Sequence, residues 1–253
     1  MAADMKSDKP TLVLLHGWGM NQGVWRAVVS QFEHKVSLLT PDLPGFGLSQ
    51  QYPMPYQLDA VIELLAEQIP DDSYLCGWSL GGLLAIRLAK CFPHKVKQVG
   101  LVAASPCFVA DAHWPGMAEQ VLQQFALALS NNLTQTIERF LAIQAMGSSN
   151  AREDIKALRQ AIMAYPTAQP EAVVGALQLL KLDLRSEFSA LTQPVRGIFG
   201  RLDALVPADV VKPLQLLNRN AQLSVVEHAS HAPFISHPDA FNHWLSDWVG
   251  VEL

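Results

Sequence analysis

The sequence of 253 residues predicts an α/β fold, with a mainly parallel central sheet covered by helices on both faces and an inserted all-helical cap. Three observations predict it. Short apolar segments alternate with segments of helical periodicity, and a glycine-rich turn joins one apolar segment to the helical segment after it. No clear strand is recognisable in residues 107–192.

Six segments rich in apolar and β-branched residues are expected to form the sheet. Because helical segments separate most of them, the strands are expected to run parallel. They cover residues 11–15, 36–40, 73–77, 98–104, 195–199 and 223–226. The chain before Thr11 is short and polar, so we expect no antiparallel hairpin ahead of the first strand.

The run Gly77-Trp78-Ser79-Leu80-Gly81-Gly82 joins the third expected strand to an apolar helical segment. Gly-x-Ser-x-Gly between a strand and a helix is the sharp turn that presents a nucleophilic serine, here Ser79. Gly77 and Gly81 leave out the side chains that would collide in such a turn. The free N–H groups at the start of the helix favour negative charge beside the serine hydroxyl. For this motif alone, an ordinary glycine-rich turn is the alternative.

A nucleophilic serine needs a base to take its proton and an acid to orient that base. In this arrangement the acid and then the histidine follow the serine along the chain. Asp203 stands in the loop after the fifth expected strand, and His228 and His231 follow the sixth. Such loops lie at the sheet edge where α/β proteins gather their active sites. We expect His231 to be the base, because its loop must turn back toward Ser79, and His228 to lie on the surface.

Two backbone N–H groups are needed to stabilise the oxyanion that forms during attack on an ester. One is that of Leu80, the residue after the nucleophile. The first expected strand ends in His16-Gly17-Trp18-Gly19, and we expect the N–H of Trp18 to be the second donor. His16 itself is expected to make structural hydrogen bonds within this turn.

The long strand-free stretch is expected to form a helical cap over the active site. Four parts of it carry apolar residues at helical spacing, and Gly147 and Pro166 divide them. The expected helices cover residues 118–129, 133–145, 151–164 and 170–180. This predicts a core domain of residues 1–108 and 185–253, with the cap at residues 109–184.

The composition fits a cytoplasmic enzyme. The chain is 50% hydrophobic, enough for a large core, yet no apolar run approaches the roughly 20 residues that span a membrane. With 18 basic and 23 acidic residues, the net charge of −5 argues against general nucleic-acid binding. The polar start is unlike a secretory signal, and the three cysteines have neither disulfide nor metal spacing. We therefore expect a cytoplasmic monomer that does not bind membranes.

Several segments resemble the esterase family of biotin synthesis, which belongs to the α/β-hydrolases. They are the run around Ser79, Ser105-Pro106-Cys107-Phe108, Trp114-Pro115-Gly116, Glu138-Arg139-Phe140-Leu141-Ala142 with Gln144, Met146-Gly147, and His231-Ala232-Pro233-Phe234-Ile235-Ser236-His237-Pro238. The similarity extends from about Thr11 almost to the C-terminus and includes the cap, which varies most among α/β-hydrolases.

The resemblance implies an α/β-hydrolase fold and hydrolysis of the methyl ester of pimeloyl-[acyl-carrier protein]. It implies Ser79, Asp203 and His231 as the catalytic triad. It also implies a set of substrate contacts: Trp18, Ser79, Leu80, Phe140, Leu141, Ala142, Ile143, Gln144 and His231. For the cap residues among these, simple helix packing is the alternative. The chain departs from the family in its short start, in Gln135 where an arginine is expected, and in Lys156, which replaces another arginine.

The expected chemistry needs no metal or cofactor, because the serine forms an acyl-enzyme that water then hydrolyses. A general short-chain carboxylesterase is the alternative activity. A binding protein without catalysis is the other, and the presence of Ser79, Asp203 and His231 argues against it.

Basic residues on the cap suggest where an acidic acyl-carrier protein would dock. Arg152, Lys156 and Arg159 share one face of an expected helix, and Arg139 lies on the helix before it. A solvated charged face is the alternative, because Glu153 and its neighbour Asp154 lie within the same segment.

Overall fold

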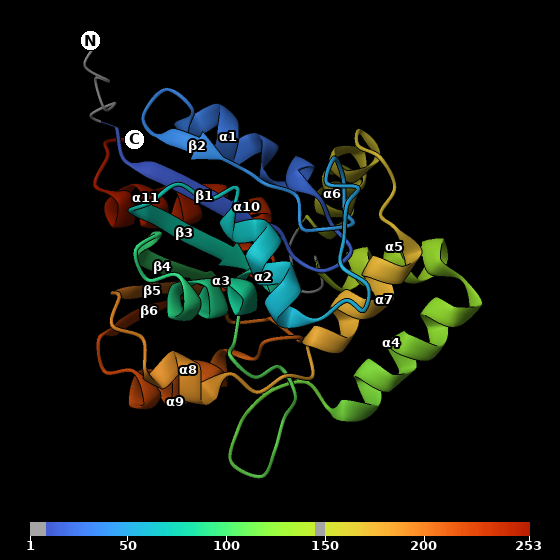
Figure 1. The fold of residues 1–253 in the computed structure, drawn as a ribbon. Coiled ribbons are helices and arrows are strands. Elements are labelled where there is room, and N and C mark those ends of the chain that lie inside the picture. Colours follow the sequence, from blue (N-terminus) through green and yellow to red (C-terminus); the bar gives the residue numbers. More distant parts are fainter. Residues whose placement is uncertain (1–8, 145–149) are drawn as a thin grey trace.

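The central sheet consists of six parallel strands in the computed structural model, which describes residues 9–144 and 150–253. Their order across the sheet is β2-β1-β3-β4-β5-β6 (Figure 1). The strands are β1 Thr11–Leu15, β2 Ser37–Leu39, β3 Ser73–Trp78, β4 Val96–Val102, β5 Val195–Gly200 and β6 Ala221–Val226. All five neighbouring pairs run parallel, as the alternation of strands and helices predicted.

Burial along the strands follows their place in the sheet. The inner strands β1 and β3 are buried almost throughout, whereas the edge strand β2 has no buried residue and the edge strand β6 has only Ala221. The expected ends of β4 were wrong by two residues. Ala103 has a φ of 45°, which an extended strand cannot accommodate, so the strand ends at Val102.

Helices cover both faces of this sheet. Figure 1 shows α2 and α3 in front of the sheet and α11 behind it, where Trp248 of α11 packs against Gly100 of β4. The helices outside the cap are η1 Gln22–Trp25, α1 Arg26–Phe32, α2 Leu58–Ala66, α3 Leu80–Cys91, α8 Arg185–Ser189, η2 Ala208–Val210, α9 Val211–Leu217, α10 Pro233–Ser236 and α11 Pro238–Val249.

Besides α8, four helices lie between β4 and β5 in the described part of the chain, as the periodicity predicted. They are α4 Glu119–Asn131, α5 Leu133–Gln144, α6 Ala151–Met163 and α7 Pro170–Leu179. Figure 1 shows them gathered at the end of the sheet toward which the strands point. The expected helix over 133–145 ends at Gln144, and Ala145 and the expected breaker Gly147 lie outside the described residues. The division into a core and a cap at residues 109–184 remains a prediction.

The prediction for the chain before the first strand concerns residues 1–8, which also lie outside the described residues. Within the described ranges, none of the helices combines the length and the apolar character needed to cross a membrane.

Candidate active site

Ser79 occupies a strained turn between β3 and α3. Its φ of 54° and ψ of −119° are unfavourable for any residue with a side chain. A methyl group on Gly77 would collide with the backbone of Gly81, and one on Gly81 would lie 2.5 Å from the carbonyl oxygen of Leu15. Glycine at both positions therefore allows the turn to close against β1 and to hold Ser79 at the start of a helix.

His231 and Asp203 meet in the core although 28 positions separate them in the chain. Nδ1 of His231 lies 2.7 Å from Oδ2 of Asp203, and both side chains are almost fully buried. The other carboxylate oxygen accepts hydrogen bonds from the N–H groups of Leu205 (2.8 Å) and Val206 (2.9 Å). The carboxylate is thus fixed by its own loop. Because a carboxylate only accepts hydrogen bonds, its contact with Nδ1 places the ring proton there.

The second ring nitrogen of His231 points away from Asp203. Nε2 is buried and has no hydrogen-bond partner among the described residues. The indole N–H of Trp78, the residue before Ser79, donates to the carbonyl oxygen of His231 (2.8 Å) and ties this loop to the turn. Hydrogen bonds between a base and its nucleophile often form fully only with substrate bound. The other histidine of the loop, His228, is exposed.

The turn after β1 lies directly against Ser79. A Cβ atom built on Gly17 would be 3.3 Å from Cβ of Ser79, which places the neighbouring Trp18 beside the nucleophile. Leu80 is the first residue of α3, and the N–H groups of a first helical turn have no acceptor within the helix. The two expected oxyanion donors therefore flank Ser79.

The side chain of His16 supports this turn, as expected. Its Nδ1–H donates to the carbonyl oxygen of Gly17 (2.8 Å), and its Nε2 accepts the N–H of Leu43 (3.0 Å). Burial lowers the pKa of His16 below its ordinary value, although the carboxylate of Asp42 acts in the opposite direction. A neutral ring is also what these two hydrogen bonds require, since one nitrogen donates and the other accepts.

Helices between β4 and β5 hold the side chain of Trp18. Its indole N–H donates to the carbonyl oxygen of Val173 on α7 (2.9 Å). The ring of Phe140 on α5 packs edge-on against Trp18 with ring centres 4.8 Å apart, and Phe125 of α4 packs against both rings. Phe140 and Leu141 are buried, while the side chains of Ala142 and Ile143 are not among those described. Phe140 of the predicted substrate segment thus forms an apolar wall with Phe125 beside Trp18.

Gln144 connects this wall to the loop of His231. The residue is fully buried, its Nε2 donates weakly to the carbonyl oxygen of Phe140 (3.3 Å), and its Oε1 has no partner among the described residues. Its carbonyl oxygen accepts a hydrogen bond from Oγ of Ser230 (2.7 Å). Sequence analysis missed both Ser230 and Trp78, whose partners are distant in the chain and leave no local pattern.

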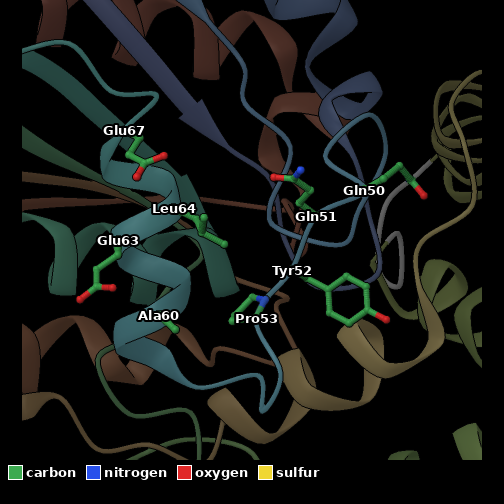
Figure 2. A pocket seen from close by; sticks show the side chains of 8 residues that line it. All are labelled: Gln50, Gln51, Tyr52, Pro53, Ala60, Glu63, Leu64 and Glu67. Carbon is green, nitrogen blue, oxygen red and sulfur yellow. The ribbon is translucent and has the colours of Figure 1, made fainter.

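Two surface hollows differ in their relation to these residues. One of about 370 Å³ is lined by Gly19, Met20 and Leu141, which follow Trp18 and Phe140 in the chain, and by the ion pair between Glu138 and Arg159. A larger one of about 630 Å³ lies elsewhere, between α2 and the loop before it (Figure 2). Its described lining includes Gln50, Gln51, Tyr52, Glu63 and Glu67, but no member of the Ser79, Asp203 and His231 set. The described lining of the smaller hollow contains none of these three residues either, but it includes chain neighbours of Trp18 and Phe140.

The four basic residues expected to contact a carrier protein are exposed on two cap helices. Arg139 lies on α5, which contacts α6, the helix that carries Arg152, Lys156 and Arg159. Nη2 of Arg159 lies 2.8 Å from Oε1 of Glu138, so part of its charge is already balanced. Among the described residues there is no cluster of three or more His, Cys, Asp or Glu side chains that could hold a metal ion.

Comparison with known proteins identifies the family. Residues 12–244 match the model of the "Alpha/beta hydrolase family". A "Pimeloyl-[acyl-carrier protein] methyl ester esterase" of Pseudoalteromonas atlantica is 46% identical over 92% of this chain and 91% of that protein. One of the same name from Aeromonas hydrophila is 44% identical over 95% of this chain and 96% of that protein.

Solved structures agree on the fold. A bromoperoxidase from Bacillus anthracis superposes with a TM-score of 0.84 at 20% identity, covering 96% of this chain and 93% of its own. An esterase from Exiguobacterium antarcticum has a TM-score of 0.81 at 19% identity, and the match covers 95% of this chain and 92% of that chain. The chain belongs to the alpha/beta hydrolase family and, within it, to the pimeloyl-[acyl-carrier protein] methyl ester esterases.

Proposed function

We propose that this protein is a serine carboxylesterase that hydrolyses the methyl ester of pimeloyl-[acyl-carrier protein] to the free carboxylate and methanol, in biotin synthesis. The observation that carries the proposal is the buried pair of His231 and Asp203, which the hydrogen bond from Trp78 ties to the strained turn of Ser79. It occurs in a chain that is 46% identical to a relative bearing that name.

In the proposed reaction, His231 accepts the proton of Ser79 while the hydroxyl oxygen attacks the ester carbonyl. The N–H groups of Trp18 and Leu80 stabilise the negative charge on the tetrahedral intermediate. His231 then returns the proton to the leaving methoxide, and methanol departs from the acyl-enzyme. Water, deprotonated by the same histidine, attacks the acyl-enzyme and frees the carboxylate and Ser79. Asp203 keeps the proton on Nδ1, so that Nε2 can accept the one from Ser79.

The apolar wall supports a preference for the methyl ester over its product. The pimeloyl spacer has five methylene groups, and burying each contributes roughly 0.8 kcal/mol, or about 4 kcal/mol in total. A carboxylate in the same surroundings costs several kcal/mol unless a charged partner is present. We therefore assign Phe140, Leu141, Ala142, Ile143 and Gln144 to the channel for the acyl chain. The buried ring of Phe140 acts there partly by supporting Trp18.

Carrier docking is the second part of the proposal. We assign Arg139, Arg152, Lys156 and Arg159 to a basic surface for an acidic acyl-carrier protein. The hollow of about 370 Å³ runs from the ion pair of Arg159 to residues next to Trp18, so it offers a path for the acyl-bearing arm. Charge steering of this kind acts mainly on the rate of encounter and weakens with salt.

Complementation tests the function directly. A biotin auxotroph that lacks this esterase should grow without biotin when it carries the intact gene, and should not grow with Ser79→Ala. If the intact protein hydrolyses p-nitrophenyl acetate but neither supports growth nor cleaves the carrier-linked ester, the general carboxylesterase is the correct assignment.

Docking is tested by charge reversal in the purified enzyme. Arg152→Glu combined with Lys156→Glu should lower kcat/KM for the carrier-linked ester about tenfold at low ionic strength, and less at high salt. Hydrolysis of p-nitrophenyl acetate should stay unchanged. Arg159 is left intact, because a glutamate there would face Glu138. Arg219→Glu, at an exposed position before β6, is the control for a general change of charge. Equal losses on both substrates would refute the docking surface.

The cytoplasmic location, the monomeric state and the boundaries of the cap stay predictions from the sequence.

A further inference from the structure

Ser230 joins the loop of the expected base to the cap. Its side chain is almost fully buried, and its Oγ donates a hydrogen bond of 2.7 Å to the carbonyl oxygen of Gln144. The two residues are 86 positions apart in the chain. Gln144 is the last residue of α5, and Ser230 immediately precedes His231.

The carbonyl oxygen of Gln144 has its donor outside the described part of α5. A buried carbonyl left without a donor is destabilising. The side-chain amide of Gln144 cannot serve, because its Nε2 faces the carbonyl oxygen of Phe140 and its Oε1 is itself an acceptor. The hydroxyl of Ser230 supplies this donor.

The hydrogen bond completes a chain of contacts around the site. From Ser230 it passes through Gln144 to α5, where the ring of Phe140 packs against Trp18. Trp18 is the expected source of one oxyanion donor, and His231 is the expected base. A single helix of the cap therefore contacts both sides of the reaction centre, and the Ser230 hydroxyl holds its C-terminal end.

We propose that Ser230 is a positioning residue, which holds the end of α5 against the loop of His231 and thereby sets the shape of the acyl-chain channel. The inference rests on the proposed esterase function, but not on the identity of the carrier-linked substrate. Loss of the hydroxyl frees the end of α5. Acyl chains long enough to reach this wall are then bound less well, whereas an acetyl group does not depend on it.

The test compares p-nitrophenyl hexanoate with p-nitrophenyl acetate in the purified enzyme. Ser230→Ala should lower kcat/KM for the hexanoate about tenfold, chiefly through a higher KM, and should change that for the acetate less than about twofold. Ser230→Thr keeps the hydroxyl and should restore the hexanoate reaction. Ser236→Ala removes a hydroxyl whose hydrogen-bond partners are close in the chain, the carbonyl oxygen of Ala232 (3.3 Å) and Nδ1 of His237 (3.0 Å), and should leave both reactions unchanged.

The proposal is overturned if Ser230→Ala keeps the hexanoate reaction, loses both reactions equally, or is not rescued by threonine. Should the alanine variant fail to fold, Ser230→Cys offers a weaker donor of similar size and should show a smaller loss of the same selectivity. The comparison of the two p-nitrophenyl esters tests the apolar wall without any carrier protein. Failure of the carrier-linked assay in the unaltered enzyme would therefore count against the proposed function and leave this inference intact.

Discussion

The backbone strain at Ser79 can be isolated by measuring stability. A residue with a side chain at φ 54° and ψ −119° costs about 1–3 kcal/mol, whereas glycine adopts this conformation without the steric penalty. Ser79→Ala keeps the strain and Ser79→Gly removes it. Both variants lack the nucleophile, so only their free energies of unfolding need to be compared.

Ala118→Gly is the matched control for this pair. Ala118 also precedes a helix, α4, but at an ordinary φ of −60° and ψ of 137°. Replacing alanine by glycine at either position has the same effect on the flexibility of the unfolded chain and on the preference at a helix N-cap. The difference between the two changes therefore measures the strain.

We expect the alanine-to-glycine change at position 79 to be more favourable than that at position 118 by about 1–3 kcal/mol. For a chain of this size, each kcal/mol corresponds to about 2–4 °C in Tm. Urea titrations give the free energies, and thermal scans provide an independent reading. An equal effect at both positions would show that the turn at Ser79 is relaxed in solution and would refute the reasoning.

Two further predictions follow from the hydrogen bonds of the site. Burial lowers the pKa of His16 in the native state, so below about pH 6.5 the unfolded chain binds a proton that the native protein does not. The free energy of unfolding should then fall by up to about 1.4 kcal/mol per pH unit on acidification. His16→Asn should make this dependence on pH weaker. An unchanged dependence in the variant would show that His16 does not cause it. Asp203→Asn presents an amide to Nδ1 of His231, which favours the tautomer that cannot accept the Ser79 proton. It should lower kcat about 10⁴-fold with little change in Tm, and a loss below about tenfold would exclude the proposed triad.

The fold could be predicted from the sequence because its signals are local. Apolar periodicity identified α4, α5, α6 and α7, each with ends within about two residues of those in the structure, but not the short α8 that follows them. The β4 boundary was missed because it depends on the positive φ of Ala103, a conformation that the apolar run around it does not reveal.

The candidate site was predictable only where spacing and chain order carry the information. The turn at Ser79 is a motif of consecutive residues, and the order of Ser79, Asp203 and His231 follows from the strands that precede them. The bond from Trp18 to Val173 spans 155 positions, and that from Ser230 to Gln144 spans 86. No local pattern encodes such contacts, because they depend on how the cap packs on the core.

Ion pairs between neighbouring helices could not be predicted from the sequence either. Helical spacing placed Arg152, Lys156 and Arg159 on one face of α6, and all three are exposed there. It gave no indication that Glu138 of the neighbouring helix would pair with Arg159, since that contact depends on the packing of α5 against α6. Arg152 and Lys156 are therefore better positions than Arg159 for a charge-reversal test of docking.

The contacts of α5 and α7 with the rest of the chain also bear on how substrate reaches Ser79. Lifting these helices would break the bond from Trp18 to Val173 and that from Ser230 to Gln144, and would separate the packed rings of Trp18 and Phe140. Each lost hydrogen bond would leave buried polar groups without partners unless water entered. The same movement would release the side chains beside the expected oxyanion donor and base. Entry through the hollow beside Met20 would break none of these contacts, so we expect the acyl chain to enter there.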